Sequence, residues 1–265
     1  MNDRVTAAPP ILMRHDSDAV ATLTLNRPQA RNALSIGLMT ALDDELAGIA
    51  ADSSVRVVVL AAAGPGFCAG HDMREMRGTP TRAAYEDVFA ICTRLMRRIV
   101  SLPKPVIARV HGVASAAGCQ LVATCDLAIA GESARFATPG VNIGLFCSTP
   151  MVALSRAVGR KAAMEMLLTG DLIDAKKAQE IGLVNRVVAD EALEEATMAL
   201  ARQIASKSPL TLAIGKEAFY RQADMDLANA YEYTAKIMTE NMLANDAAEG
   251  IDAFLEKRAP VWSGT

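Results

Sequence analysis

The sequence predicts an α/β fold whose last third is made of helices alone. Two observations support this prediction. Short β-rich runs at residues 19–26, 57–62 and 105–110 are separated by longer amphipathic segments, which is typical of crossover units. After residue 148, apolar residues recur at helical spacing through most of the chain.

In the first third we expect the polar residues 1–18 to form a loose arm followed by an edge strand. Residues 19–26 alternate between apolar and polar side chains and predict a strand. Residues 36–51 predict a helix for which Ser35 is a suitable N-cap, and residues 57–62 predict a buried strand.

Farther along, residues 74–82 are polar and predict a loop, and residues 83–101 predict a helix. A short buried strand at 105–110 leads into a stretch of small residues that becomes an apolar helix. Residues 125–148 predict strand-like pieces broken by Gly and Pro. In the last third a brief strand is expected at 182–188, and helices are expected at 151–158, 161–168, 175–181, 191–207, 209–221, 227–243 and 246–257.

Composition narrows the classes of function. A formal net charge of −3 without a long basic block argues against a nucleic-acid partner. No apolar run reaches the roughly 20 residues that span a bilayer, and the first residues lack a signal-peptide pattern, so we expect no membrane partner and a cytoplasmic location. The five Cys are scattered without metal-ligand spacing, which favours free thiols in a reducing compartment and no metal site.

The central stretch is HGVASAAGCQLVATCD, from His111 to Asp126. A strand that ends in a tight turn and starts a helix leaves backbone N–H groups free at the helix N-terminus, where they can hold an anion or a developing oxyanion. The small Ala116, Ala117 and Gly118 would let a carbonyl come close. A tight packing contact between helix and strand explains the same residues equally well.

A second stretch follows the same logic. RVVVLAAAGPGFCAGHDM, residues 56–73, is a strand followed by a Gly/Pro loop. Together the two stretches closely resemble the enoyl-CoA hydratase/isomerase (crotonase) superfamily, and the resemblance extends from NRPQARNALS to FLEKRAPVW. Within that superfamily, AAGCQLVATCDLAIA and FATPGVNIGLFCSTP look most like the enoyl-CoA hydratase domain-containing protein 3 subgroup.

The resemblance implies a crotonase-like spiral of ββα units with a C-terminal helical trimerisation region. Residues 1–200 would be the spiral core that binds the thioester of coenzyme A (CoA), and residues 201–265 the helical region for oligomerisation. The implied assembly is a homotrimer or a dimer of trimers. The implied oxyanion hole consists of the backbone amides of His71 and Ala117, with the imidazole of His71 in a structural role.

The implied ligand is an acyl-CoA or enoyl-CoA thioester, with CoA as part of the substrate and no tightly bound cofactor. Lys257 would reach the CoA of a neighbouring subunit. Ordinary solvated charge is the alternative for each cation. The residues implied to bind CoA are Arg27, Arg31, Ala33, Ala69, Asp72, Arg74 and Lys257.

Hydratases of this superfamily resemble one another in two glutamates that bind water and move its proton. Here those catalytic positions are Gln120 and Gly140. Glutamine is not a general base at neutral pH, although its amide can orient a water. We also expect Gly140 to adopt a positive φ that a glutamate would resist.

Other polar candidates near the acyl group are Cys119, Asn142, Cys147 and Ser148, with Glu75 as a further possible base. Cys147 falls near a Tyr position of methylmalonyl-CoA decarboxylase, which shares the AGHD string, and is the catalytic candidate among them. Ser148 falls where dienoyl-CoA isomerases carry an acid. Inert packing is the alternative for a Cys in an apolar loop.

Three functions remain open on the sequence. The first is an acyl-CoA enzyme of the hydratase/isomerase type, nominally hydrating 2-enoyl-CoA in fatty-acid metabolism. The second is a decarboxylase or isomerase that needs the oxyanion hole and not the two glutamates. The third is a protein that binds acyl-CoA with little or no catalysis.

Overall fold

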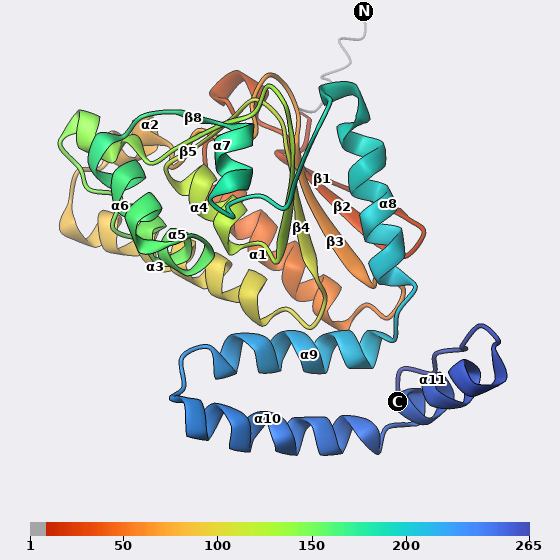
Figure 1. The fold of residues 1–265 in the computed structure, drawn as a ribbon. Helices are drawn as coiled ribbons and strands as arrows, with labels where there is room; N and C mark the ends of the chain where they lie inside the picture. The colour runs from red at the N-terminus through yellow and green to blue at the C-terminus, as the bar shows by residue number, and fades with distance from the viewer. Residues whose placement is uncertain (1–8) are drawn as a thin grey trace, which may run out of the picture.

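The computed structural model describes residues 9–265, so the expected N-terminal arm at residues 1–8 lies outside it. A six-stranded sheet forms the centre, and its strand order is β1-β2-β3-β4-β6-β9 (Figure 1). Only the β1/β2 pair is antiparallel; the other neighbours are parallel. The strands are β1 Leu12–Ser17, β2 Val20–Leu25, β3 Val57–Ala62, β4 Val106–Val110, β6 Leu127–Gly131 and β9 Arg186–Val188.

A smaller sheet joins β5 Val113–Ser115, β7 Arg135–Ala137 and β8 Ile173–Asp174. The bridges Leu34–His71 and Cys68–Ala114 extend it. The segments that follow β3, β4 and β6 therefore each contribute a short piece to this second layer, which is the repeating ββα unit of the predicted spiral. The predicted α/β spiral of ββα units is confirmed.

Helices cover both faces of the large sheet. In Figure 1, α8 lies on the opposite side of the sheet from α1, α3 and α4. The α-helices up to this point are α1 Ile36–Ala51, α2 Met73–Gly78, α3 Arg82–Ser101, α4 Ala117–Thr124, α5 Pro150–Ala157, α6 Arg160–Thr169, α7 Ala175–Glu180 and α8 Leu193–Ala205. Short 3-10 helices cover Pro28–Ala30, Pro139–Ile143 and Asp190–Ala192.

The predicted helix α1 is confirmed together with its N-cap, because the Ser35 hydroxyl accepts from the amide of Leu38 at 3.2 Å. Glu75 also accepts from the amide of Ile36 at 2.9 Å, so a second side chain holds this helix start. The prediction of a loop after residue 73 is wrong for its first part. There the Asp72 carboxylate accepts from two amides and starts α2.

The C-terminal helical region consists of α9 Pro209–Gln222, α10 Leu227–Met242 and α11 Asn245–Glu256. The predicted boundary at residue 200 falls inside α8, and α8 packs Leu193, Leu200 and Ala201 against the large sheet. The helical region therefore begins at α9, below the sheet in Figure 1. No helix of residues 9–265 is both long and apolar enough to cross a bilayer.

A buried polar cluster fixes α9 to the core. The Lys216 ammonium donates to Asp126 at 2.7 Å and to the carbonyls of Ile99 and Lys104 at 2.8 and 3.0 Å. The Tyr220 hydroxyl donates to the other oxygen of Asp126 at 2.9 Å. Asp126 ends the central stretch, so α9 is tied to the segment that carries the candidate site.

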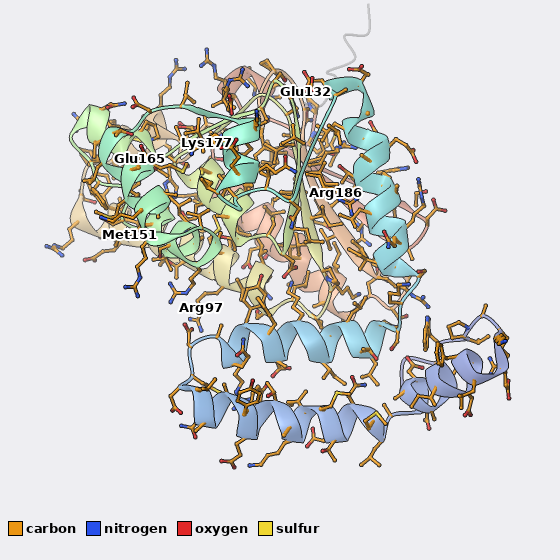
Figure 2. All side chains as sticks on the ribbon, in the orientation of Figure 1. Arg97, Glu132, Met151, Glu165, Lys177 and Arg186 are labelled. Carbon is orange, nitrogen blue, oxygen red and sulfur yellow. The ribbon has the colours of Figure 1, made fainter. Side chains whose placement is uncertain are left out.

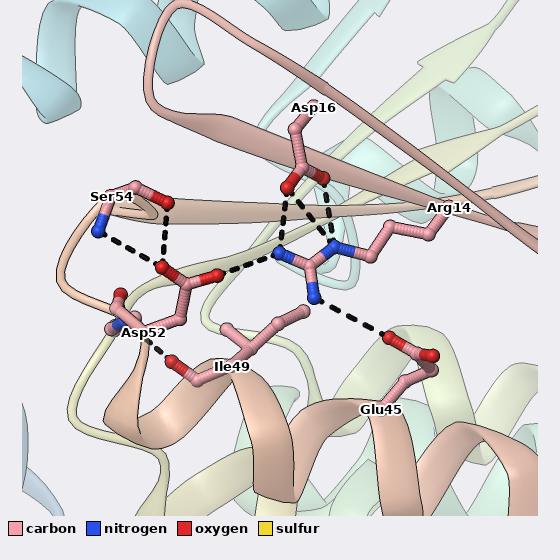
Figure 3. Close-up of polar contacts among 7 residues, drawn as sticks. Arg14, Asp16, Glu45, Ile49, Asp52 and Ser54 are labelled. Carbon is pink, nitrogen blue, oxygen red and sulfur yellow. Dashed lines mark hydrogen bonds and ion pairs between the residues drawn. The ribbon is translucent and has the colours of Figure 1, made fainter.

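An exposed ionic cluster holds the edge strand β1 to the end of α1 (Figure 3). The Arg14 guanidinium contacts Asp16 at 2.6 Å, Asp52 at 2.8 Å and Glu45 at 3.5 Å. Ser54 donates to Asp52 at 2.6 Å. Charged side chains on an edge strand also disfavour its pairing with a strand of another chain, which its unpaired backbone groups would otherwise allow.

Lys216→Ala should destabilise the protein, because it leaves the carboxylate of Asp126 buried without its cation. Lys216 is 7% exposed and Asp126 16% exposed, so the expected loss is about 3 kcal/mol. Urea unfolding measures this loss, and limited proteolysis should show α9 cleaved first. The control is Lys236→Ala, which removes an exposed pair with Glu232 and should cost less than about 0.5 kcal/mol. Equal effects of the two variants would contradict the anchoring role.

Asp52 should titrate well below an ordinary aspartate. Hydrogen bonds from Ser54, and then from Arg14, lower its pKa to about 2. Because the folded pKa is depressed, its contribution to stability is complete above the unfolded pKa of about 3.9 and is lost as the pH falls towards 2. Carboxyl NMR titration of the wild type and of Ser54→Ala measures the shift. An unchanged Asp52 pKa in Ser54→Ala would count against the assignment.

Candidate active site

The amide of Ala117 is exposed by a strained turn. Ala116 is the residue before α4, and it has φ 49° and ψ −116°, a region that L-residues rarely adopt. Its own N–H donates to the carbonyl of Ala137 at 2.9 Å, which fixes the turn to β7. As the first residue of α4, Ala117 has no partner for its N–H within the helix. This N–H therefore points out of the helix N-terminus, where negative charge is favoured.

Within the described part of the chain, the backbone N–H of His71 has no backbone partner because of the orientation of the parallel bridge between His71 and Leu34. Leu34 donates to the carbonyl of Gly70 at 2.8 Å and accepts from the amide of Asp72 at 3.1 Å. In such a bridge the N–H of the middle residue, His71, points away from Leu34. No backbone hydrogen bond within residues 9–265 uses the His71 amide.

The two amides belong to segments in direct contact. Gly70 has φ +99°, and a Cβ added to it would lie 3.3 Å from the nitrogen of Ala117 and 2.9 Å from the Cβ of Ala116. Only glycine provides both this conformation and this space. At Gly118 an added Cβ would overlap the Cys68 carbonyl, so the alternative of tight helix–strand packing is also correct. The same small residues therefore allow close packing and place no large side chain of their own over the amides of His71 and Ala117.

Asn32 was missed by the sequence analysis and anchors the loops around this contact. Its side chain is fully buried, donates to the carbonyls of Ala63 and Gly66 at 2.8 and 2.9 Å, and accepts from the amide of Arg27 at 2.8 Å. It thereby joins the loop before α1 to the loop after β3. The signal available in the sequence was an Asn in a turn, a residue that tolerates the positive φ of 53° found here.

The predicted CoA-binding residues divide into two groups. Arg27 and Asp72 form an ion pair at 2.9 Å, and Arg27 also donates to the carbonyl of Ala33 at 2.6 Å. Their charges are therefore used within the protein, and they hold the residue that follows His71. The amide of Ala69 donates to the carbonyl of Arg31 at 3.0 Å and completes this connection.

The other predicted cations are exposed. Arg31 sits in a left-handed turn, and Arg74 begins α2 beside the two loops. Lys257 ends α11, which lies at the opposite end of the molecule from α2 (Figure 1). The structure therefore brings Arg31 and Arg74 near the amide pair but does not bring Lys257 there within one chain.

Gln120 lies one helical turn after Ala117, on α4. It is 5% exposed, and its Oε1 is buried without a partner. Helical side chains tilt towards the helix N-terminus, so the Gln120 amide leans over the turn that carries the Ala117 amide. Gln120 also lines a cleft of about 760 Å³ between α3, α4, α5 and α9.

Gly140 and Cys147 are neighbours. A Cβ added to Gly140 would lie 2.9 Å from the Cys147 sulfur and 2.7 Å from the Leu145 carbonyl oxygen. Gly140 is not among the glycines of positive φ, so our expectation about its conformation is wrong. The obstacle to a side chain at position 140 is steric, because the Leu145 carbonyl and the Cys147 thiol already occupy the space.

The remaining candidates give no additional base. Glu75 is used to cap α1. Asn142 and Ser148 are exposed, and Cys119 is fully buried. Among the described residues, no group of three His, Cys, Asp or Glu side chains is placed to hold a metal ion.

His71, Cys119 and Cys147 are neutral at pH 7. Burial lowers the pKa of His71 to about 4, and its ring packs edge-on against Phe89 at 5.6 Å between centroids. Burial raises the pKa of Cys119 to about 12 and also raises that of Cys147. Neither thiol is therefore a thiolate nucleophile, in agreement with inert packing.

Within residues 9–265, the buried side-chain polar atoms that lack a hydrogen-bond partner are His71 Nε2, Gln120 Oε1 and Thr138 Oγ1. All three belong to segments of the amide pair or adjoin them, because Thr138 follows the Ala137 that holds Ala116. Buried polar atoms normally have partners, so such a cluster points to a site that binds a ligand or water. The fold and this site define a protein of the α/β spiral class with a paired-amide anion site.

The chain belongs to the enoyl-CoA hydratase/isomerase family, whose sequence profile matches residues 15–265. It is 47% identical to human mitochondrial enoyl-CoA hydratase domain-containing protein 3, over 93% of this chain and 81% of that protein. It is 37% identical to 2,3-dehydroadipyl-CoA hydratase of Escherichia coli (strain K12), over 92% of this chain and 95% of the relative.

Solved structures agree. A crystal structure of enoyl-CoA hydratase from Mycobacterium smegmatis superposes with a TM-score of 0.94 at 55% identity, over 96% of this chain and 99% of that one. The human enoyl-CoA hydratase domain-containing protein 3 gives a TM-score of 0.93 at 45% identity, over 96% and 100%. The resemblance noted in the sequence, subgroup included, is confirmed.

Gly70→Ala should weaken acyl-CoA binding strongly and also lower stability, because the new methyl group would lie 3.3 Å from the Ala117 nitrogen at a φ of +99°. Isothermal titration with an acyl-CoA measures the binding, and urea unfolding measures stability. The control is Gly48→Ala in α1, where an added Cβ meets nothing within 4 Å. That variant should bind normally and gain up to about 1 kcal/mol of stability. Normal binding by Gly70→Ala would contradict this placement of the amide pair.

Proposed function

We propose that this protein binds an acyl-CoA or enoyl-CoA thioester and polarises its carbonyl with the amides of His71 and Ala117, acting as a lyase or isomerase. The observation that supports the proposal is the contact of Gly70 with the Ala116–Ala117 turn, together with the absence of a backbone partner for the amides of His71 and Ala117 among the described residues. Membership of the enoyl-CoA hydratase/isomerase family supports the general class of reaction.

Both amides would donate to the thioester oxygen as it gains charge. In an acyl-transfer enzyme, removal of one such donor costs about 3 kcal/mol of transition-state stabilisation. The donors are fixed by the small sheet and the start of α4, so they need not reorganise during the reaction. The amides would stabilise the thioester enolate that forms when a nucleophile adds to the β-carbon or when a proton or CO₂ leaves the α-carbon.

Proton transfer is the part of hydration that this site supports poorly. The two hydratase glutamate positions hold Gln120 and Gly140, and the neighbouring His71 and Cys147 are neutral. A positioned acid or base contributes typically about 10²–10⁴-fold to a rate. We therefore expect the protein to hydrate crotonyl-CoA only slowly.

The lack of an identified general base favours a second candidate, decarboxylation of a malonyl-type thioester. Loss of CO₂ leaves its bonding electrons on the α-carbon and forms the enolate without a base, so the amide pair is sufficient for that step. Release of CO₂ from malonyl-type thioesters tests this function. Tight binding of acyl-CoA without turnover of either substrate would instead identify a binding protein.

The CoA end of the ligand would lie beside the exposed Arg31 and Arg74, while Arg27, Ala33, Ala69 and Asp72 shape the loops beneath it. CoA enters as part of the substrate, and we propose no tightly bound cofactor.

We propose that copies of this chain assemble as a trimer or a dimer of trimers. The support is α10, which buries no residue within the chain, and the high exposure of Leu227, Tyr231, Leu243 and Phe254, between 71% and 82%. Lys257 would then reach the CoA of a neighbouring copy. A cytoplasmic location stays a prediction from the sequence.

Gln120→Glu should raise the rate of crotonyl-CoA hydration by at least tenfold, because it places a carboxylate one turn from the Ala117 amide. Adding Gly140→Glu should not raise it further, because the new Cβ would collide with Leu145 and Cys147. The loss of absorbance of the enoyl thioester measures the rate. The control is Gln179→Glu on α7, which should leave it unchanged. Rapid hydration by the unmodified protein would overturn the argument that its acid–base groups are missing.

A further inference from the structure

The cleft beside Gln120 follows one face of α4 away from the amide pair. Gln120, Ala123 and Thr124 line it at the helical spacing i, i+3 and i+4. Its volume of about 760 Å³ is within the range of about 300–1,000 Å³ typical of small-molecule sites. The buried, unpartnered Gln120 oxygen marks the end nearest the amides.

Much of the cleft wall is apolar. Four helices contribute to it: α3, α4, α5 and α9. Side chains of this kind suit the methylene chain of an acyl group that enters past Gln120. The apolar lining residues outside α4 include Met96, Val100, Val152, Ala153, Phe219 and Ala223.

Cations line the same cleft. Arg97 comes from α3 and Arg156 from α5, and Figure 2 shows Arg97 on the side of α3 that faces α9. The α3 neighbours of Arg97, Arg94 and Arg98, are both bound to Asp43, whereas Arg97 pairs with no carboxylate of the described residues.

One acid partly offsets these charges. Asp224 lies 3.9 Å from Arg156, with exposed fractions of 76% and 63%, which is a weak pair in water. The lining therefore carries a net charge of +1 from Arg97, Arg156 and Asp224.

We infer that the acyl cleft selects acyl-CoA thioesters whose chain ends in a carboxylate. The inference rests on the proposed function, because it takes the amide pair as the thioester site. A terminal carboxylate would meet the exposed guanidinium groups of Arg97 and Arg156, which can donate charge-assisted hydrogen bonds to it in a salt-dependent interaction. A terminal methyl group would displace water from the guanidinium groups and return no hydrogen bond.

The test compares thioesters that differ only at the chain end. Suberyl-CoA is matched with octanoyl-CoA, and adipyl-CoA with hexanoyl-CoA, by isothermal titration on the full chain. For at least one pair we expect the carboxylate form to bind about tenfold more tightly, with a preference that shrinks at high salt. Equal or tighter binding of both neutral forms would overturn the inference.

Single-residue variants test which side chains cause the preference for a terminal carboxylate. Arg97→Ala and Arg156→Ala should each lower the affinity for the carboxylate form about three- to tenfold and leave the neutral form within twofold. Asp224→Asn should raise the affinity for the carboxylate form. The matched control is Arg160→Ala at the start of α6, outside the cleft, which should change neither. Loss of affinity for both forms in the arginine variants would overturn the assignment.

The outcomes separate this inference from the proposed function. Binding of all four thioesters without a preference would refute the selectivity and leave the amide-pair function standing. Failure of all four to bind, with a folded protein by circular dichroism, would refute both. Both are supported if Gly70→Ala no longer binds any of the four thioesters while the wild-type protein prefers the carboxylate forms.

Discussion

The contact between Gly70 and the Ala116–Ala117 turn determines where both candidate donors point. It arises in the small sheet, where Cys68 donates to Val113 and accepts from Ser115, at 3.0 and 2.9 Å. That pairing sets the register of the two segments, and a shift by one residue would turn the His71 and Ala117 amides away from a common point. The pairing of these backbone segments therefore determines the geometry of the site.

Outer contacts keep this register in place. Asn32 and the Arg27–Asp72 pair connect three loops around the contact, and Lys216 connects α9 to the end of α4. These groups are charged or amide side chains, and the sequence suggested other roles for them or none. Burial makes their partners essential, because a buried charge that loses its partner costs several kcal/mol.

Regular elements and the two turns of small residues could be predicted from local pattern. The strands at Val57–Ala62 and Val106–Val110 and the helix α1 with its Ser35 cap follow from hydrophobic period and capping chemistry. The short α2 could not be predicted, because a single Asp72 cap outweighs a polar sequence. The roles of Arg27 and Asp72 depend on an ion pair between residues that are 45 positions apart, and no local sequence pattern predicts such a pair. The same holds for Gly140, whose constraint comes from Cys147.

The structure also indicates which positions can change chemistry without loss of the scaffold. At Gly70 and Gly118 an added side chain would collide with backbone, so the amide pair tolerates nothing larger. Gln120 is different: its Oε1 has no protein partner, and a carboxylate of nearly equal size would fit without loss of a hydrogen bond. Gly140 is also constrained, because an added Cβ would lie 2.7 Å from the Leu145 carbonyl oxygen and 2.9 Å from the Cys147 sulfur. The oxyanion hole and the proton-transfer groups are thus separable parts of this fold, and a chain can keep the first while it lacks the second.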